Sequence, residues 1–122
     1  KGLGAVHSMS HALGADKNLK LHHGTLNGVI LPTILRFNHG HVGDKYSRIS
    51  RAMGILESTD LPDFIEELNQ TIGLPKNLTE MGVTEDMIPG LAAHSMTDPS
   101  NATTPRLPSQ SEWENLFVEA MK

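Results

Sequence analysis

Cysteine is absent from this sequence of 122 residues, and aromatic residues make up only 4% of it. The lack of cysteine excludes disulfide bonds, thiolate metal sites, iron–sulfur clusters and cysteine nucleophiles. No apolar run approaches the roughly 18 residues of a membrane-spanning helix, so we expect no membrane partner. The first residues show no signal-peptide pattern, and we expect a cytoplasmic protein.

Positive charge is also scarce in this sequence. Ten Lys and Arg residues oppose 14 Asp and Glu residues, which gives a net charge of −4 with histidine neutral. Binding to a phosphate backbone requires clustered positive charge, so this balance argues against nucleic acid as a partner. The apolar fraction of 38% is typical of a folded domain with one hydrophobic core.

Helical periodicity dominates the sequence, and it contains no sustained two-residue alternation of the kind that a half-buried strand shows. We therefore predict an all-α fold, a bundle of about six helices that forms a single domain over residues 1–122. A turn-rich connector is expected over residues 97–109. The expected helices cover about residues 3–13, 24–38, 44–56, 61–72, 88–92 and 110–121.

Two of these helices carry features that affect their packing. Gly4, Ser8 and Ala12 are spaced by four, so one stripe of the first helix is nearly bare backbone and allows a neighbouring helix to approach closely. Pro32 lies inside the second helix. It should kink that helix because it cannot donate a hydrogen bond to the carbonyl of Gly28.

The later helices are predicted from apolar stripes and from a cap. Ser111 and Glu114 have the form of a capping box at the start of the last helix. The helices over residues 44–56 and 61–72 each carry an apolar stripe that indicates a face packed on a core. The stripes consist of Tyr46, Ile49, Met53 and Leu56, and of Leu61, Phe64, Ile65, Leu68 and Ile72.

Four of the seven histidines fall within the first 23 residues: His7, His11, His22 and His23. His7 and His11 share one helix face because they are four residues apart, and the other two follow in the next loop. Neutral imidazole is the commonest protein ligand for divalent transition metals. Spacing alone therefore selects His7 and His11 as metal ligands. The alternative is that all four are ordinary polar residues at a junction between helices.

The segments GLGAVHSMSHALGA and HHGTLNGVILPTILRFN resemble the iron-containing (group III) alcohol dehydrogenases. That family carries a glycine-rich helix with two histidines four apart, then a short loop ending in His-Gly. A buried helix of the form N-x-V-x-L-P-x-x-L-x-x-N follows. His7 and His11 match the helical pair, and His23-Gly24 matches the end of the loop. Further matches extend the resemblance over nearly the whole chain: Asp44-Lys45-Tyr46, Gly73-Leu74-Pro75 and Pro105-Arg106.

The resemblance implies a parent with two domains, an N-terminal α/β domain that holds NAD(P) and a C-terminal helical domain that holds the metal. This chain would be the last portion of the helical domain. The family's metal, Fe²⁺ or in some members Zn²⁺, has one aspartate and three histidine ligands. The roles of two ligands carry over to His7 and His23, a half-site within residues 1–24. His11 would be a catalytic and cofactor-binding residue beside the nicotinamide and the substrate, which overrules its selection as a ligand from spacing.

Two departures from the family pattern change these expectations. His22 stands where many members have proline, so His22 and His23 compete for the ligand role, and the following Gly24 favours His23. The family's other two metal ligands and its glycine-rich pyrophosphate site would precede residue 1. We therefore expect the isolated chain to bind metal weakly and to show no hydride transfer.

The resemblance implies a parent enzyme that interconverts a small-molecule alcohol and an aldehyde, with the metal polarising the substrate oxygen. A maleylacetate reductase, which shares the fold, is one alternative. A stand-alone helical module for metal binding or interaction is another. Helices that lack their packing partners would expose apolar surface, so we also expect a homo-oligomer.

Overall fold

The computed structural model describes residues 2–122, and within them it contains six α-helices, two 3-10 helices and no strand. The prediction of an all-α fold with about six helices is confirmed. None of the helices in this range is long and apolar enough to cross a membrane. The helices are α1 (Ala5–Gly14), α2 (His23–Asn38), α3 (Lys45–Ala52), α4 (Leu61–Thr71), η1 (Glu85–Met87), α5 (Ile88–Thr97), η2 (Pro99–Thr103) and α6 (Gln110–Ala120).

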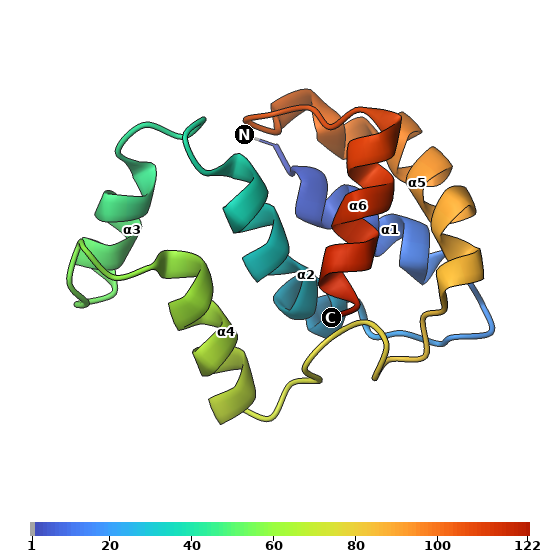
Figure 1. The fold of residues 1–122 in the computed structure, drawn as a ribbon, viewed down its shortest axis with the longest axis horizontal. Helices are drawn as coiled ribbons and strands as arrows, with labels where there is room; N and C mark the ends of the chain where they lie inside the picture. Colours follow the sequence, from blue (N-terminus) through green and yellow to red (C-terminus); the bar gives the residue numbers. More distant parts are fainter. Residues whose placement is uncertain (1) are drawn as a thin grey trace.

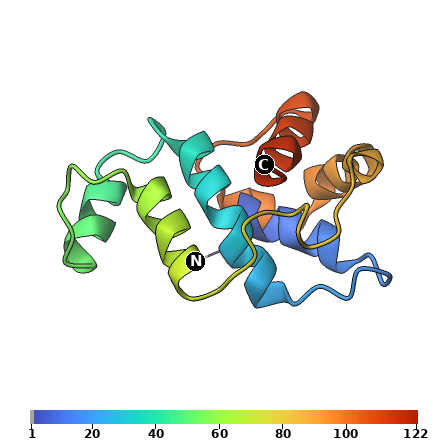
Figure 2. The same ribbon diagram turned by 60° about the horizontal axis from the view of Figure 1, so that its bottom comes forward.

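The hydrophobic core lies among α1, α2, α5 and α6 (Figure 1). α1 packs against both α2 and α5, and α6 packs against α5 and α2. α4 packs on another side of α2, and α3 lies farther out (Figures 1 and 2). Trp113 and Phe117 of α6 are completely buried, as are Met9 and Leu13 of α1. Burying each of these large side chains contributes about 1.5–3 kcal/mol, so this region supplies most of the stability of the fold.

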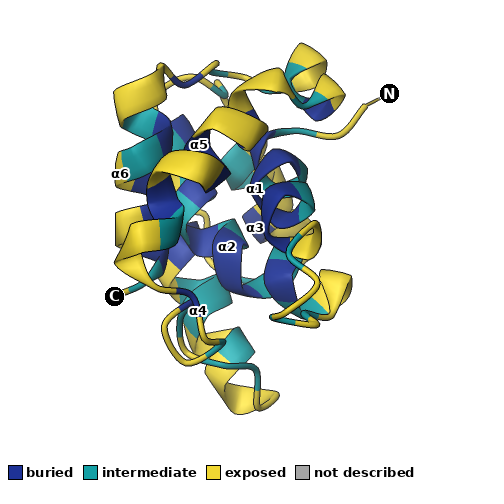
Figure 3. Cartoon of the chain, turned by 90° about the vertical axis from the view of Figure 1, so that its right-hand side faces the viewer, coloured by how far each residue is buried: buried dark blue, intermediate teal, exposed yellow. Residues whose placement is uncertain are grey.

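Small residues line the contact between α1 and α5, as the spacing in α1 predicts. Ser8 and Ala12 of α1 are buried, and so are Ala92 and Ser95 of α5. The Ser95 hydroxyl donates to the carbonyl oxygen of Ser8 over 3.3 Å. A side-chain hydroxyl can reach the backbone of another helix only when the two helices lie close together. Dark blue buried residues mark this contact in Figure 3.

α2 continues through Pro32 as one helix because the hydrogen bond that Pro32 cannot make is replaced from outside. The Nδ2 atom of Asn69, on α4, donates to the carbonyl oxygen of Gly28 over 2.8 Å. Gly28 also permits a close approach, since a Cβ atom there would lie 2.7 Å from Cδ1 of Leu74. The acceptor that proline leaves free in α2 therefore becomes the point where α4 is attached.

The expected helix over residues 44–56 is shorter in the structure and packs less. α3 ends at Ala52, and Gly54 follows with a φ of +72°, a left-handed conformation that favours glycine and ends the helix. Ile49 and Met53 are each 41% exposed and Leu56 is 75% exposed. The apolar stripe of this segment therefore does not face the core. In the same way, Leu68 and Ile72 at the end of the α4 stripe are exposed.

The capping box of α6 lies two residues earlier than predicted. The Ser109 hydroxyl accepts from the backbone N–H of Glu112, whose carboxylate accepts from the N–H of Ser109. The prediction of Ser111 with Glu114 is therefore wrong. Both pairs have the same spacing, and the structure starts the helix after Ser109, where Pro108 precedes the cap. The predicted connector also contains one ordered element, η2.

Candidate metal site

Three histidine rings meet where α1 passes the start of α2. His7 and His11 project from successive turns of α1, and His23 is the first residue of α2. The ring centroids are 5.8 Å apart for His7 and His11, 5.3 Å for His7 and His23, and 5.5 Å for His11 and His23. These three residues are called the histidine cluster below. The loop over residues 15–22 turns the chain back and so brings His23 to the face that carries the helical pair.

Asn27, one turn after His23 on α2, indicates where two of these rings point. Its Nδ2 atom lies 3.2 Å from Nε2 of His23 and 3.4 Å from Nε2 of His7. Its Oδ1 atom is buried and has no hydrogen-bond partner. An amide N–H donates to an imidazole nitrogen only if that nitrogen carries a lone pair. The Nε2 atoms of His7 and His23 therefore face one common point, and each can bind a metal ion there in the tautomer that has its lone pair on Nε2.

The buried Ser10 contacts the other ring nitrogen of His23 in a way that is compatible with the same tautomer. Its hydroxyl donates to the carbonyl oxygen of His7 over 3.2 Å, and its oxygen lies 3.4 Å from Nδ1 of His23. A serine hydroxyl has a single hydrogen, which the carbonyl already accepts. The contact with His23 is then a donation from Nδ1–H to Ser10, which leaves the lone pair on Nε2.

The electrostatics of the cluster favour neutral imidazole at His7. Partial burial lowers the pKa of His7 below its ordinary value, and the neighbouring rings of His23 and His11 lower this pKa further. Asp98 acts in the opposite direction but does not cancel the shift. Because a metal binds the unprotonated ring, a lowered pKa keeps His7 available as a ligand in mildly acidic solution.

His11 differs from the other two rings because it pairs with a buried carboxylate. Its Nδ1 atom lies 2.9 Å from Oδ2 of Asp98, whose side chain is 7% exposed. Burial by itself would raise the pKa of Asp98, but hydrogen bonds with Ser100 and His11 outweigh it and hold this pKa below its ordinary value. The carboxylate therefore stays ionised at neutral pH.

Asp98 was not among the functional residues that we predicted from the sequence. It lies 87 residues from His11, within a segment that reads as a turn-rich connector. The one local signal is Asp followed by Pro, which is typical of a helix start, and Asp98 does cap η2. Nothing in the local sequence connects it to a histidine, because that contact depends on how α5 packs against α1.

His22 lies next to His23 in sequence, but in the structure it caps the start of α2. It is the N-cap residue of α2, and its Nδ1 atom accepts from the backbone N–H of Thr25 over 3.3 Å. Its ring lies over Gly24, where a Cβ atom would be 3.1 Å from the His22 ring. The structure thus brings His7, His11 and His23 together and uses His22 to begin the helix.

The histidine cluster offers some, but not all, of the ligands that a metal site needs. Within residues 2–122 no group of three or more His, Asp or Glu side chains is arranged to hold a metal ion by itself. Two neutral imidazoles whose Nε2 atoms face one point still fit iron or zinc, since both metals accept nitrogen ligands of this kind. An apolar pocket of about 470 Å³ adjoins the cluster, with His7 and Asn27 in its wall.

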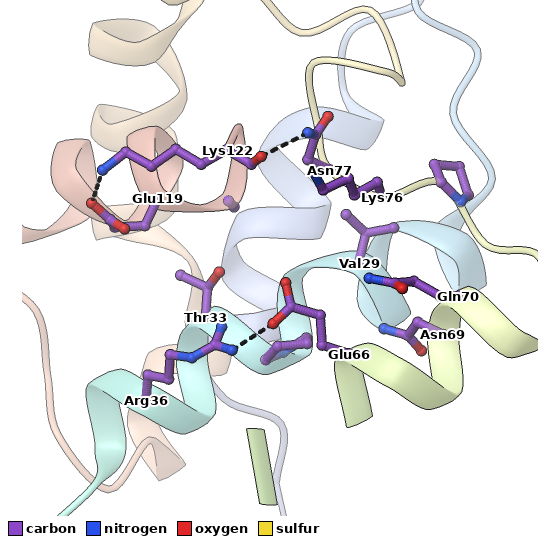
Figure 4. A pocket seen from close by; sticks show the side chains of 13 residues that line it. Val29, Thr33, Arg36, Glu66, Asn69, Gln70, Lys76, Asn77, Glu119 and Lys122 are labelled. Carbon is purple, nitrogen blue, oxygen red and sulfur yellow. Dashed lines mark hydrogen bonds and ion pairs between the residues drawn. The ribbon is translucent and has the colours of Figure 1, made fainter. Parts of the chain in front are cut away.

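A second pocket, of about 360 Å³, lies among α2, α4 and the C-terminal end of the chain, and its lining is polar (Figure 4). Arg36 pairs with Glu66 over 2.5 Å, and Lys122 pairs with Glu119 over 2.5 Å. Since these charges neutralise one another, we assign no ligand to this pocket.

Comparison with known proteins identifies the family. Residues 1–121 match the sequence model of the Fe-containing alcohol dehydrogenase family, C-terminal region. The chain belongs to the iron-containing alcohol dehydrogenase family. It is 38% identical to a 4-hydroxybutyrate dehydrogenase from Cupriavidus necator, over 99% of this chain and 34% of that protein. It is 36% identical to a lactaldehyde reductase from Escherichia coli strain K12, over 98% of this chain and 33% of that protein.

A solved structure of the same family confirms the fold. The crystal structure of a 1,3-propanediol oxidoreductase matches with a TM-score of 0.89 and 30% sequence identity, over 98% of this chain and 33% of that one. The chain therefore spans about a third of the length of the relatives that it matches. Those relatives are oxidoreductases, and the family is iron-containing by description and includes NAD-dependent members. The resemblance read from the histidine motifs is confirmed.

Proposed function

We propose that this chain provides the metal-binding helices of a dehydrogenase that interconverts a small alcohol and an aldehyde with NAD(P). The observation that carries this proposal is the convergence of the His7 and His23 Nε2 atoms on one point. The family supplies the reaction class, because relatives that match the whole chain are dehydrogenases and reductases of small molecules.

In this proposal His7 and His23 hold a divalent metal ion through their Nε2 atoms. Fe²⁺ is the expected ion, and Zn²⁺ is compatible because imidazole binds both. When bound, the metal supplies Lewis acidity that polarises the oxygen of the substrate. Asn27 would give up its two weak contacts to these nitrogens when the metal arrives. The remaining ligands would come from protein outside this chain, so the chain alone should bind metal weakly.

His11 is assigned to the substrate and the nicotinamide. Its ring centroid lies 5.5 Å from that of His23, so it would be next to a metal ion held by His23, and its Nδ1 atom contacts Asp98. The apolar walls of the adjoining 470 Å³ pocket suit the carbon chain of a small alcohol. NAD(P) would be held mainly by a separate α/β domain, and we expect no hydride transfer from this chain by itself.

Calorimetric titration of the metal-stripped chain with Zn²⁺ tests the ligand assignment. Zn²⁺ is used because it does not change oxidation state. We expect saturable binding near one ion per chain, at least tenfold weaker in His7→Ala and in His23→Ala. The matched variants His11→Ala and His22→Ala should bind within a few-fold of the unmodified chain.

The outcomes of this titration separate the possible assignments. Loss of binding in His22→Ala with binding kept in His23→Ala would transfer the ligand role to His22. Equal loss in His11→Ala would restore the pair selected from spacing alone. An absence of binding in the unmodified chain, with its circular dichroism unchanged, would contradict the proposal that two imidazoles form a half-site.

A further inference from the structure

We propose that Asp98 is the positioning residue for His11: it holds the proton of the neutral ring on Nδ1 and leaves the Nε2 lone pair free to accept a hydrogen bond from a substrate hydroxyl. This inference rests on the proposed function and assigns a second residue to the same site. No step of it requires the metal to be present.

The carboxylate of Asp98 is held by two different hydrogen bonds. Its Oδ1 atom accepts from the backbone N–H of Ser100 over 2.8 Å, and this bond caps η2. Its Oδ2 atom is left to face Nδ1 of His11 over 2.9 Å. The side chain of Asp98 is 7% exposed, whereas that of His11 is 39% exposed. A buried, fixed acceptor therefore contacts the inner nitrogen of a ring whose remainder is open to solvent.

The segment that carries Asp98 is itself attached to α1. The Ser8 hydroxyl, one turn before His11, donates to Oδ1 of Asn101 over 2.7 Å. The Nδ2 atom of Asn101 donates to the carbonyl oxygen of Ser95 over 2.8 Å. These bonds connect α1, the end of α5 and η2 on both sides of Asp98. The distance between His11 and Asp98 is thus set by the packing of two helices and a turn rather than by one flexible side chain.

The chemistry of the pair determines the tautomer of His11. An ionised carboxylate has no hydrogen and can only accept, so Nδ1 of His11 must be the donor. A neutral imidazole has one N–H, and when that N–H is on Nδ1 the lone pair is on Nε2. Without Asp98 the ring would be free to take the other tautomer and to rotate about its side-chain bonds. Asp98 thus selects both the nitrogen that is free and the direction in which it points.

Asp98→Asn is the informative substitution because it should preserve the fold. Asparagine is as good an N-cap residue as aspartate, so its Oδ1 atom can still accept from Ser100. Its Nδ2 atom then faces Nδ1 of His11 and donates to it, which moves the ring proton to Nε2. An Asp→Asn change beside a histidine has this consequence in the Ser-His-Asp triad, where it keeps the geometry and gives the wrong tautomer.

The test is a long-range ¹H–¹⁵N correlation spectrum of the metal-free, ¹⁵N-labelled chain, recorded about two pH units above the usual histidine pKa. His11→Ala identifies the His11 signals by their disappearance. In the unmodified chain the lone-pair nitrogen, which resonates far downfield, should be Nε2 of His11. In Asp98→Asn it should be Nδ1. Asp16→Asn is the matched control, because Asp16 accepts from the backbone of Asn18 in the turn after α1, and it should leave the His11 spectrum unchanged.

Two results would overturn the positioning role. One is an Nε2–H tautomer of His11 in the unmodified chain. The other is a spectrum of Asp98→Asn, with native circular dichroism, in which His11 keeps its proton on Nδ1. If either result is obtained in a chain that binds Zn²⁺ through His7 and His23, only the positioning role of Asp98 is contradicted. The proposed half-site would be unaffected. The expected exchange of tautomer in a chain that binds no Zn²⁺ would instead support the pairing of Asp98 with His11 and contradict the proposed half-site.

Discussion

Asn69 completes α2 with one side-chain hydrogen bond from another helix. Its amide donates to the carbonyl oxygen of Gly28, the acceptor that Pro32 leaves without its usual helical donor. A partly buried backbone carbonyl that loses a hydrogen-bond donor costs free energy of the order of a lost hydrogen bond. The stability of α2 in the middle of the molecule therefore depends on a residue 41 positions away.

We expect Asn69→Ala to lower the free energy of unfolding by about 1–2 kcal/mol, measured by urea denaturation. The neighbouring Gln70 is exposed, and Gln70→Ala should change stability by less than about 0.5 kcal/mol. Pro32→Ala restores a backbone N–H that can donate to Gly28. The loss from Asn69→Ala should therefore be clearly smaller when Pro32→Ala is already present. Equal losses in both backgrounds would show that Asn69 does not act through this carbonyl.

Among the elements, the contact between α1 and α5 determines the geometry of the site. We call this contact, formed by Ser8 and Ala12 of α1 and Ala92 and Ser95 of α5, the seam. α1 carries His7 and His11, and Asp98 follows directly after α5, so the distance between the two helices determines the contact between His11 and Asp98. Small residues on both helices make that distance short, with Ala92 completely buried. Any side chain that forces the helices apart should disturb both stability and the site.

Ala92→Leu tests this seam, and Ala93→Leu is its matched control. Ala92 is 0% exposed, whereas Ala93 on the next position of α5 faces solvent. We expect Ala92→Leu to lower the free energy of unfolding by about 1–3 kcal/mol through overpacking. Ala93→Leu should change it by less than about 0.5 kcal/mol. Similar denaturant midpoints for the two variants would show that the seam can expand without cost.

Considering the whole molecule, the side formed by α3 is much less buried than the side that contains the hydrophobic core. α1, α2, α5 and α6 enclose the core, whereas α3 extends beyond α4 (Figures 1 and 2). Apolar side chains on and just after α3 stay open to solvent, among them Ile49, Met53 and Leu56. Exposed apolar groups close together in sequence are a common origin of association between copies of a chain.

We propose that the chain self-associates through this surface, and sedimentation velocity over a range of concentrations measures it. The sedimentation coefficient should rise with concentration in the unmodified chain. It should stay at the monomer value in the double variant Met53→Ser, Leu56→Ser. Val118→Ser removes an apolar side chain that is 39% exposed on α6 and should leave association unchanged. A monomer at all concentrations would contradict the expected homo-oligomer.

The helices and the family could both be predicted from local sequence patterns. Apolar spacing, glycine and capping residues act over three or four positions, so they indicated the all-α class and the positions of the main helices without any tertiary information. The histidine motif on α1 and the His-Gly at the start of α2 identified the family, and His7, His11 and His23 do meet in space.

The residues that complete these local patterns come from distant parts of the chain and are known from the folded structure alone. The contact between His11 and Asp98 joins residues 87 apart, and the bond from Asn69 to Gly28 joins residues 41 apart. The apolar stripe of α3 shows that periodicity defines a face but not the surface that covers it. Hydrogen bonds and burial between distant segments depend on how the helices pack. The spacing of residues within one helix does not predict that packing.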